Sequence, residues 1–582
     1  MAMRNLLKVL LIVLYLLAGY GQYLERLADL GESSALLLAS YLGLFAILAL
    51  ALLLAAFIRN DAWRWSWAVL LAAGGIFCDS YIRISGSYLT YSIFVSHFYS
   101  VSAIDEAILQ YWPTIRVSLA LGLMLLAGLG MRPALSGALR PAPEHSNAPL
   151  PRAPAVGRAF VLACALAPLL GLILLTTILF QRGGTGARGL PVMFTPLAYL
   201  QLFAYEHVTT DIGPRQSVTL PRDDAAIDHD IVLIIDESVG GNYLALNARH
   251  GVRTPLESPP PHIDVFNYGY AAAIGSCSAD VNLTLRFGGT RDDYIRINAS
   301  MPSIWQYARA AGMETIYVDA QRIDGRLHNL MTDLELHHVD RFIQFDDVPV
   351  RDRDMAVADT LAHLMNDGKA QLIVANKMGA HFPIHDKYPD EFMVHRPSLA
   401  RGSFLDVGDT GLRRGFAGTP EDWTLYRNAY RNTLHWNVGE FFRRLFAATD
   451  FAKVVAIYTS DHGQDLHERG SPGLNTHCGG DPVIEEGLVP LAVIQGKGLT
   501  TLDWEKHLAV NKDASSHYNI FPTMLQLMGY DLTAVRAVYG NPLSVPTEDP
   551  FTFNIKFNGR MGAEPAWKYI DLREIVTPVP PG

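Results

Sequence analysis

The sequence predicts a bundle of membrane-spanning helices followed by a large α/β domain. Half of the 582 residues are hydrophobic and the mean hydropathy is +0.15, which is more apolar than is usual for a soluble protein. The apolar residues gather in the first third of the chain, whereas β-rich runs alternate with helical patterns in the rest. We therefore expect a transmembrane domain over residues 1–182, a bridging segment over 183–221 and a second domain over 222–582.

Five apolar runs in the first third are spaced as transmembrane helices. They cover residues 6–20, 35–58, 65–78, 115–131 and 159–180. The third run is short and ends at Cys78-Asp79. The first run is not followed by the small residues of a cleavage site, so we expect it to remain as a membrane helix and not to be removed as a signal peptide.

The distribution of positive charge predicts the orientation in the membrane. Basic residues lie at the first run, between the second and third runs, and between the fourth and fifth: Arg4, Lys8, Arg59, Arg64, Arg132, Arg140, Arg152 and Arg158. These segments are expected in the cytoplasm, and five spans then place the second domain in the periplasm of a Gram-negative bacterium. The protein is thus predicted to be a multi-pass protein of the bacterial inner membrane. A net charge of −10 and the lack of a basic block argue against a nucleic-acid partner.

Two segments are expected at the membrane surface. Residues Ser85 to Pro113 are rich in aromatic and hydroxyl side chains, which is typical of an interfacial aromatic belt or of a lipid-binding segment. Residues 183–221 mix turn residues with one amphipathic run, and we expect them to connect the membrane domain to the second domain.

In the second domain, short apolar strands alternate with amphipathic helices. Strands are expected at 231–235, 314–319, 372–376, 454–459 and 488–494, and helices at Ser303–Ala311, Met355–Asn366, Trp423–Phe446 and Tyr518–Met528. Continuous β-branched runs are typical of strands that are buried on both faces of a mostly parallel sheet. In an open α/β sheet of this kind, ligands bind outside the carboxyl ends of the strands.

Polar side chains follow three of these strands directly. They are Asp236-Glu237-Ser238, the segment from Asn376 to His381, and Asp461-His462. Because the carboxyl ends of parallel strands meet at one edge of a sheet, the three segments are expected to converge. A carboxylate oxygen and an imidazole nitrogen suit zinc or manganese, so the sequence predicts a metal site at this edge.

Three stretches resemble a known family. They are TSDHGQDLHERG at 459–470, KMGAHFPIHDKYPDEF at 377–392 and NAYRNTLHWN at 428–437. Together with the five-span anchor, they resemble the membrane-anchored phosphoethanolamine transferases of Gram-negative bacteria, within the alkaline phosphatase and sulfatase superfamily. The resemblance implies an alkaline-phosphatase/sulfatase-like domain with a mostly parallel central sheet.

The resemblance also implies roles for individual residues. Metal ligands are expected at Glu237, Asp461 and His462, and substrate histidines at His381 and His477. In the family, a His-x-Pro segment followed by a basic residue, tyrosine and proline closes over the phosphate. Here these positions are His381, Pro383, Lys387, Tyr388 and Pro389, with Lys387 as a substrate-binding cation.

The nucleophile segment departs from the family pattern. Residues 273–282 contain no threonine, but Ser278-Ala279-Asp280 resembles the Thr-Ser-Asp of phosphoglycerol transferases. Ser278 is therefore predicted to be the catalytic nucleophile and the fourth metal ligand, with Cys277 as the alternative nucleophile and Ser276 as a further register. The family usually has several disulfides, whereas this domain has only Cys277 and Cys478. These two cysteines either pair in an oxidising compartment or remain buried free thiols.

The resemblance implies a zinc-dependent transferase, with manganese as a second possible metal. It would take phosphoethanolamine from phosphatidylethanolamine, form a covalent enzyme intermediate, and pass the group to lipid A, a core sugar of lipopolysaccharide or an exopolysaccharide. His381 and His477 would neutralise charge and handle protons. The loop from His395 to Glu421 is expected to select the acceptor.

Three other functions fit the same residues. A phosphoglycerol transferase would keep the chemistry and change the donor. A sulfatase would use Cys277, but its motif requires an arginine where Val281 stands. A non-catalytic lipid-binding scaffold would keep the metal for structure alone.

Overall fold

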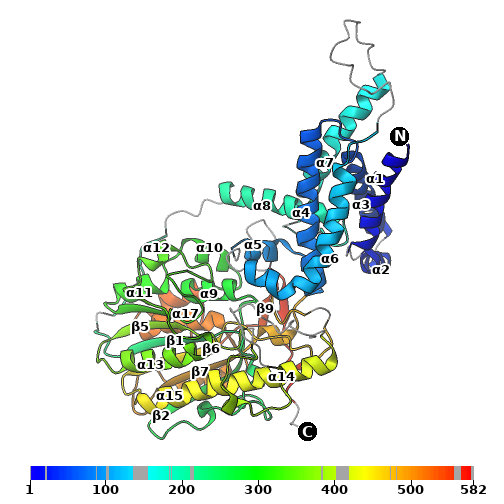
Figure 1. The fold of residues 1–582 in the computed structure, drawn as a ribbon. Helices are drawn as coiled ribbons and strands as arrows, with labels where there is room; N and C mark the ends of the chain where they lie inside the picture. Colours follow the sequence, from blue (N-terminus) through cyan, green and yellow to red (C-terminus); the bar gives the residue numbers. More distant parts are fainter. Residues whose placement is uncertain are drawn as a thin grey trace.

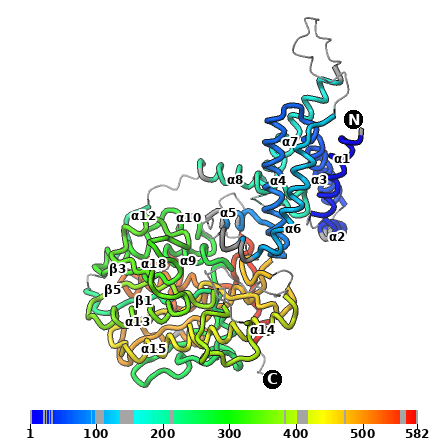
Figure 2. The backbone as a smooth tube through the Cα atoms, in the orientation of Figure 1, coloured from blue at the N-terminus to red at the C-terminus, as the bar shows by residue number. Residues whose placement is uncertain are grey.

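A computed structural model of the protein consists of a helical bundle and an α/β domain (Figure 1). It describes residues 2–19, 23–33, 35–86, 88–99, 104–134, 155–182, 184, 186–209, 215–223, 225–381, 384–400, 418–471, 474–479, 481–555 and 565–578. The backbone runs from the N-terminus in the bundle to the C-terminus on the far side of the α/β domain (Figure 2).

The first third of the chain is helical. The helices are α1 Ala2–Ala18, α2 Tyr23–Ser33, α3 Ala35–Ala55, α4 Asp61–Ser85, α5 Tyr91–Tyr99, α6 Ile104–Gly130 and α7 Ala155–Gln181. By length and composition, four of the described helices can cross a membrane: α3, α4, the Tyr111–Gly130 part of α6 and the Gly157–Gln181 part of α7. The expected first span, α1, has 17 residues, whereas about 20 residues cross a bilayer. Four spans are thus supported, and the fifth stays a prediction.

The short third run belongs to a longer helix, α4, of 25 residues. The run appeared short because Asp79 and Arg83 interrupt the apolar pattern. Asp79 is buried, and its Oδ2 accepts hydrogen bonds from Arg83 Nε and Ser118 Oγ, each at 2.7 Å. This pairing inside the bundle lets a carboxylate lie near the end of α4 that meets the α/β domain.

The bridging segment contains one long helix, as its amphipathic run predicts. After the turn Val192–Phe194, helix α8 (Thr195–Thr209) runs across the axis of the bundle, on the side of the α/β domain (Figure 1). Its Tyr205 ring packs edge-on against Phe180 of α7, with the ring centroids 5.0 Å apart. The bridge therefore begins as part of the membrane domain.

The α/β domain is built on an eight-stranded sheet with the order β4-β3-β5-β1-β6-β7-β2-β8. The strands are β1 Asp230–Asp236, β2 Ile263–Ala272, β3 Glu314–Asp319, β4 Arg341–Ile343, β5 Gln371–Asn376, β6 Val454–Ser460, β7 Leu488–Gly496 and β8 Ser515–Ser516. Strands β4, β3, β5, β1 and β6 are parallel, and β7 runs antiparallel to both β6 and β2. The mostly parallel sheet is confirmed, and the five predicted strands match β1, β3, β5, β6 and β7.

Helices cover both faces of this sheet. Successive side chains of β1 point to opposite faces, so they enter two different hydrophobic cores. Val232 and Ile234 pack with α13 Arg353–Met365, α14 Pro420–Leu434 and α15 Phe441–Ala448. Ile231, Leu233 and Ile235 pack with α9 Ser278–Phe287, α11 Ile304–Ala310 and α17 Ile520–Leu527. The single helix predicted over Trp423–Phe446 is instead α14 and α15, joined by a π-helical segment at His435–Glu440.

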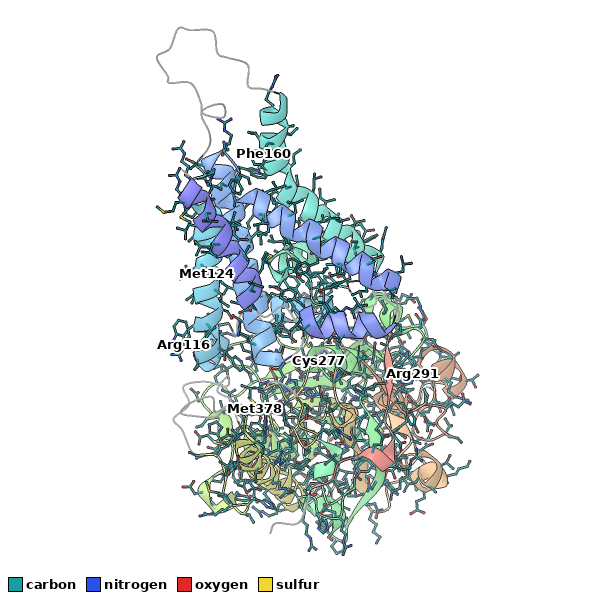
Figure 3. The ribbon with its side chains drawn as sticks, turned by 90° about the vertical axis from the view of Figure 1, so that its right-hand side faces the viewer. Arg116, Met124, Phe160, Cys277, Arg291 and Met378 are labelled. Atoms are coloured by element: carbon teal, nitrogen blue, oxygen red, sulfur yellow. A yellow bond between two sulfur atoms is a disulfide. The ribbon has the colours of Figure 1, made fainter. Side chains whose placement is uncertain are left out.

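The bundle meets the α/β domain at the end of α4. The backbone N–H of Leu474 donates to the carbonyl oxygen of Ile84 at 3.1 Å. Cys277, at the start of α9, lies on the side of the α/β domain that faces the bundle (Figure 3). The segments that precede α9 and follow β6 are thus close to the membrane domain.

Candidate metal and nucleophile site

Three buried side chains gather at the carboxyl ends of two neighbouring strands. Strands β1 and β6 are parallel, with Asp236 opposite Ser460, so Glu237 and the Asp461-His462 pair leave the sheet side by side. One ligand atom from each of these three residues lies within 4.8 Å of the other two. His462 Nε2 is 3.5 Å from Glu237 Oε1 and 3.6 Å from Asp461 Oδ2. Two of the three segments predicted to converge at this edge of the sheet are therefore side by side.

Hydrogen bonds orient Asp461 and His462 so that one atom of each side chain stays available to bind a metal ion. Asp461 Oδ1 accepts the backbone N–H groups of Ser238 and His462, while Asp461 Oδ2 is buried and has no hydrogen-bond partner among the described residues. His462 Nδ1 lies 2.7 Å from the carbonyl oxygen of Gly463, which assigns its proton to Nδ1 and leaves a lone pair on Nε2. A buried carboxylate oxygen without a donor fits a cation, so the residues present suit a metal ion.

The charges at this site depend on one another. Burial raises the pKa of Asp461, and the Glu237 carboxylate raises it further. Burial alone would lower the pKa of His462, but the neighbouring Asp461 and Glu237 raise it above its usual value. Burial opposes ionisation of Glu237, yet the neighbouring His462 and the charge of His381 hold its pKa well below the usual range. Crowding of the two carboxylates thus makes Asp461 and His462 bind protons more tightly, and a divalent cation would balance the same negative charge.

Ser278 brings a hydroxyl to the same point. It is the first residue of α9, and its Oγ is 3.0 Å from Glu237 Oε1 and 3.1 Å from His462 Nε2. Cys277 is joined to Cys478 by a disulfide, so the pairing alternative is confirmed and Cys277 has no thiol to offer as a nucleophile. Ser276 contributes a backbone contact, as its carbonyl oxygen accepts the N–H of Cys478 at 3.2 Å. Of the three candidate nucleophiles, Ser278 is the one whose hydroxyl is found within hydrogen-bonding distance of the ligand cluster.

Two predicted histidines lie around the cluster. The ring of His477 stacks on that of His462, with centroids 4.5 Å apart and an interplanar angle of 29°. His381 lies in the turn after β5, where its backbone N–H donates to the carbonyl oxygen of Met378 at 3.3 Å, and its charge lowers the pKa of Glu237. The His477 ring therefore lies against the ligand that Ser278 Oγ approaches.

Lys387 does not present its ammonium group to solvent, unlike a typical substrate-binding lysine. It is 2 % exposed, and its Nζ donates to the carbonyl oxygen of His381. Burial lowers the pKa of Lys387 to about 7. Lys387 thus supports the turn that carries His381. The role of Lys387 as a substrate-binding cation stays a prediction. Pro383 lies outside the described residues, and Tyr388 is buried with its hydroxyl 2.9 Å from Ser398 Oγ.

Sequence reasoning missed two residues after β3. Gln321 Nε2 donates to Glu237 Oε2 at 3.0 Å and to the carbonyl oxygen of Lys377 at 3.0 Å. Burial lowers the pKa of His328 to about 3, and the groups that influence it include Arg322, Glu237 and His381. The polar run that follows the predicted strand at 314–319 was the available signal, because it ends at the same edge of the sheet as the other three segments.

Asp236 lies next to Glu237 but has a different role. Its Oδ1 is 2.7 Å from Lys377 Nζ, its Oδ2 accepts the hydroxyl of Tyr458 at 2.7 Å, and both Asp236 and Lys377 are fully buried. This ion pair joins β1 to the end of β5. Asp236 is therefore engaged in the framework that supports the site.

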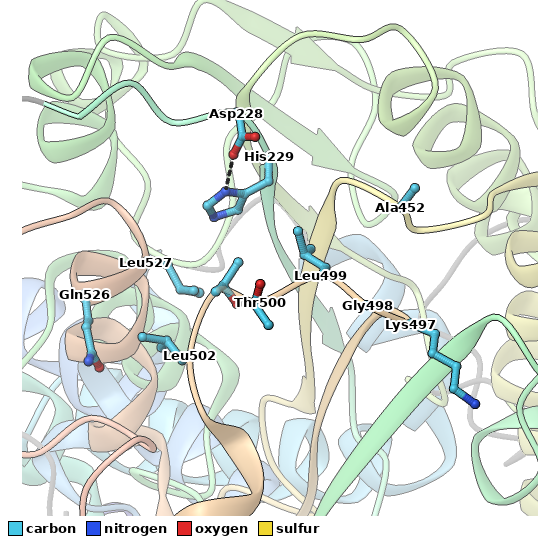
Figure 4. Close-up of a pocket in the computed structure, with 11 residues that line it drawn as sticks. Asp228, His229, Ala452, Lys497, Gly498, Leu499, Thr500, Leu502, Gln526 and Leu527 are labelled. Carbon is cyan, nitrogen blue, oxygen red and sulfur yellow. Dashed lines mark hydrogen bonds and ion pairs between the residues drawn. The ribbon is translucent and has the colours of Figure 1, made fainter.

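A separate cavity of about 570 Å³ lies at the opposite edge of the sheet (Figure 4). It is lined by Asp228, His229, Ala452, Lys497, Gly498, Leu499, Thr500, Thr501, Leu502, Gln526 and Leu527. Asp228 and His229 precede β1, whereas Glu237 follows it. The cavity is thus distinct from the metal site.

Comparison with known proteins defines the family. The sequence model of the sulfatase family matches residues 229–530, which is just over half of the chain. The protein therefore belongs to the sulfatase family. No curated protein matches its sequence.

Solved structures with a similar fold include phosphoethanolamine transferases. The integral membrane protein lipooligosaccharide phosphoethanolamine transferase A from Neisseria meningitidis has a TM-score of 0.62 and 14% identity, over 92% of this chain and 99% of that one. The periplasmic domain of EcEptC from Escherichia coli, solved in complex with Zn, has a TM-score of 0.44 and 18% identity, over 58% of this chain and 92% of that one. At 14% identity, the first match establishes the fold of the chain, with its membrane domain and its sulfatase-like domain.

Proposed function

We propose that the protein transfers phosphoethanolamine from phosphatidylethanolamine to a lipid or glycan of the cell envelope. Ser278 Oγ attacks the phosphorus and forms a covalent phosphoethanolamine enzyme, and diacylglycerol leaves with a proton. A hydroxyl or phosphate of the acceptor then takes the group from Ser278. The observation that carries this proposal is the convergence of Ser278 Oγ on Glu237 and His462, at 3.0 and 3.1 Å.

Glu237, Asp461 and His462 would hold one divalent metal ion, with the oxygen of Ser278 as a fourth ligand. Two carboxylates and an imidazole suit zinc, and manganese is the second choice. When bound, the ion would act as a Lewis acid on a phosphoryl oxygen and lower the pKa of the Ser278 hydroxyl.

His477 and His381 handle charge and protons in this proposal. Burial and the neighbouring His462 lower the pKa of His477 well below its usual value. His477 is therefore neutral near pH 7 and can accept a proton from the attacking hydroxyl of an acceptor. In this proposal His381, whose backbone carbonyl oxygen accepts a hydrogen bond from Lys387, donates to a phosphoryl oxygen.

A lipid donor fits the position of the site. Leu474, three residues before His477, contacts the end of α4 through the hydrogen bond to Ile84. The candidate site therefore lies at the junction with the membrane domain, where the headgroup of a membrane lipid is within reach. The positive-charge distribution supports a periplasmic position. Most of the loop expected to select the acceptor, residues 401–417, lies outside the described residues.

Intact-peptide mass spectrometry tests the proposal. The full-length protein is incubated with phosphatidylethanolamine vesicles and no acceptor, and the peptide that contains residue 278 is analysed. The wild type and the matched control Ser276→Ala are expected to gain the mass of one phosphoethanolamine and to release diacylglycerol, whereas Ser278→Ala gains none. An adduct on this peptide in Ser278→Ala contradicts the assignment. The absence of any adduct or diacylglycerol in the wild type contradicts the proposed donor and leaves the phosphoglycerol transferase and the non-catalytic scaffold.

A phosphoglycerol transferase is the second candidate, favoured by the resemblance of Ser278-Ala279-Asp280 to the nucleophile motif of those enzymes. Replacing the donor by phosphatidylglycerol in the same experiment separates the two. The sulfatase alternative loses support because Cys277 is disulfide-bonded.

A further inference from the structure

The single disulfide of the described residues joins the two segments that carry Ser278 and His477. Cys277 directly precedes Ser278, and Cys478 directly follows His477. The two cysteines are 201 residues apart in the sequence, and their Cα atoms are 5.1 Å apart. One covalent link therefore sets the spacing between the backbone of the proposed nucleophile and that of the proposed proton acceptor.

A backbone hydrogen bond reinforces this link. The N–H of Cys478 donates to the carbonyl oxygen of Ser276 at 3.2 Å. Cys478 has a φ of +58°, a left-handed conformation that is unfavourable for a residue other than glycine. The disulfide and this hydrogen bond together hold Cys478 in that conformation, next to the stacked rings of His477 and His462.

The preceding part of the same loop is held by other elements. The His467 ring stacks on Trp423 of α14 at 3.7 Å, and Thr476 accepts the N–H of Asp465 at 2.7 Å. Leu474 is held at the end of α4. These contacts fix the loop to α14 and to the membrane domain, whereas the disulfide fixes it to α9 and the nucleophile.

Three of the four proposed metal ligands are positioned independently of this loop. Glu237 follows β1, and Asp461 and His462 follow β6, and the ladder between these parallel strands aligns them. Opening the disulfide leaves that ladder unchanged. Metal binding and the alignment of His477 with Ser278 should therefore respond separately to loss of the disulfide.

We propose that the Cys277–Cys478 disulfide is a positioning element of the transfer reaction, which keeps His477 aligned with Ser278. The inference rests on the proposed function. A displacement of about 1 Å of a catalytic group can cost about a hundredfold in rate. Loss of the disulfide is thus expected to lower kcat ten- to hundredfold, with the metal content unchanged and KM for the donor lipid changed less than kcat.

The first test uses full-length protein in detergent micelles that contain phosphatidylethanolamine. Cys277→Ala/Cys478→Ala is compared with Cys164→Ala, which removes a buried free cysteine of α7 and is expected to keep wild-type activity. Diacylglycerol release gives kcat and KM, and elemental analysis gives the metal content. Equal kcat in the double variant and in the control overturns the proposal, as does a loss of metal that parallels the loss of rate.

The second test avoids any folding defect of the double variant. Wild-type protein is reduced, assayed, and then reoxidised, with the metal content measured at each stage. The rate is expected to fall on reduction with the metal retained, and to return on reoxidation. If the oxidised and the reduced protein release diacylglycerol equally fast, the disulfide has no positioning role, and the proposed function stands. If the oxidised protein releases none, the proposed function fails, and this inference with it.

Discussion

The metal site can be tested by replacing one of two adjacent buried carboxylates. Glu237→Gln keeps the size of the side chain and can still accept the hydrogen bond from Gln321, but it removes a charged ligand. Loss of groups that only orient a ligand costs about 10–100-fold in metal affinity. Because Glu237 offers its oxygen to the ion itself, we expect a loss of more than about a hundredfold, or about 2.7 kcal/mol.

Asp236→Asn is the matched control, because it neutralises the preceding residue. It removes the nearest ion-pair partner of the buried Lys377 ammonium. Because Asp354 Oδ2 at 3.9 Å and the carbonyl oxygen of Asn437 at 2.6 Å remain, we expect the free energy of unfolding to fall by about 3 kcal/mol, at the lower end for a broken buried ion pair. The ligand atoms of Glu237, Asp461 and His462 are unaffected by this change. The variant is therefore expected to keep its metal.

Elemental analysis and a metal titration of the purified variants, together with thermal unfolding, measure both effects. Glu237→Gln should lose metal with little loss of stability. Asp236→Asn should keep its metal and unfold at a lower temperature. A full equivalent of metal in Glu237→Gln would refute the reasoning. Loss of metal in Asp236→Asn alone would move the ligand to Asp236.

Two further predictions concern pH and the membrane domain. Burial and the neighbouring Asp465 raise the pKa of Glu486 to about 8, from a usual value of 4.5. The folded state thus favours the protonated form, so this contribution to stability is complete below about pH 4.5 and is lost as the pH rises through about 8. Thermal unfolding between pH 5 and 9 should show a steeper decline for the wild type than for Glu486→Gln, and equal slopes would contradict the assignment. A soluble piece over residues 222–582 should fold and bind metal but transfer poorly from phosphatidylethanolamine vesicles; full activity on vesicles would show that the membrane domain is dispensable.

Local patterns in the sequence were sufficient for much of the fold. Strands β1, β5 and β6 were predictable because a strand buried on both faces must be apolar along its whole length. Their parallel order then explains why Glu237 and the Asp461-His462 pair converge. Strand β2 was not predicted, because its residues IDVFNYGYAA mix polar and apolar side chains and its register with β7 is irregular between Asn267 and Tyr270.

By itself, the sequence determined the division into a membrane domain and an α/β domain, the central strands and the polar segments that follow them, since each depends on the chemistry of neighbouring residues. The choice of Glu237, Asp461 and His462 as ligand candidates came from the resemblance to a known family. Only the tertiary structure decided that Ser278 reaches the cluster, that Cys277 pairs with Cys478, and that Gln321 holds Glu237. These features join segments that lie 41, 201 and 84 residues apart. Hydrophobic periodicity reports the face that a residue presents within its own element, and it carries no information about which distant element packs beside it.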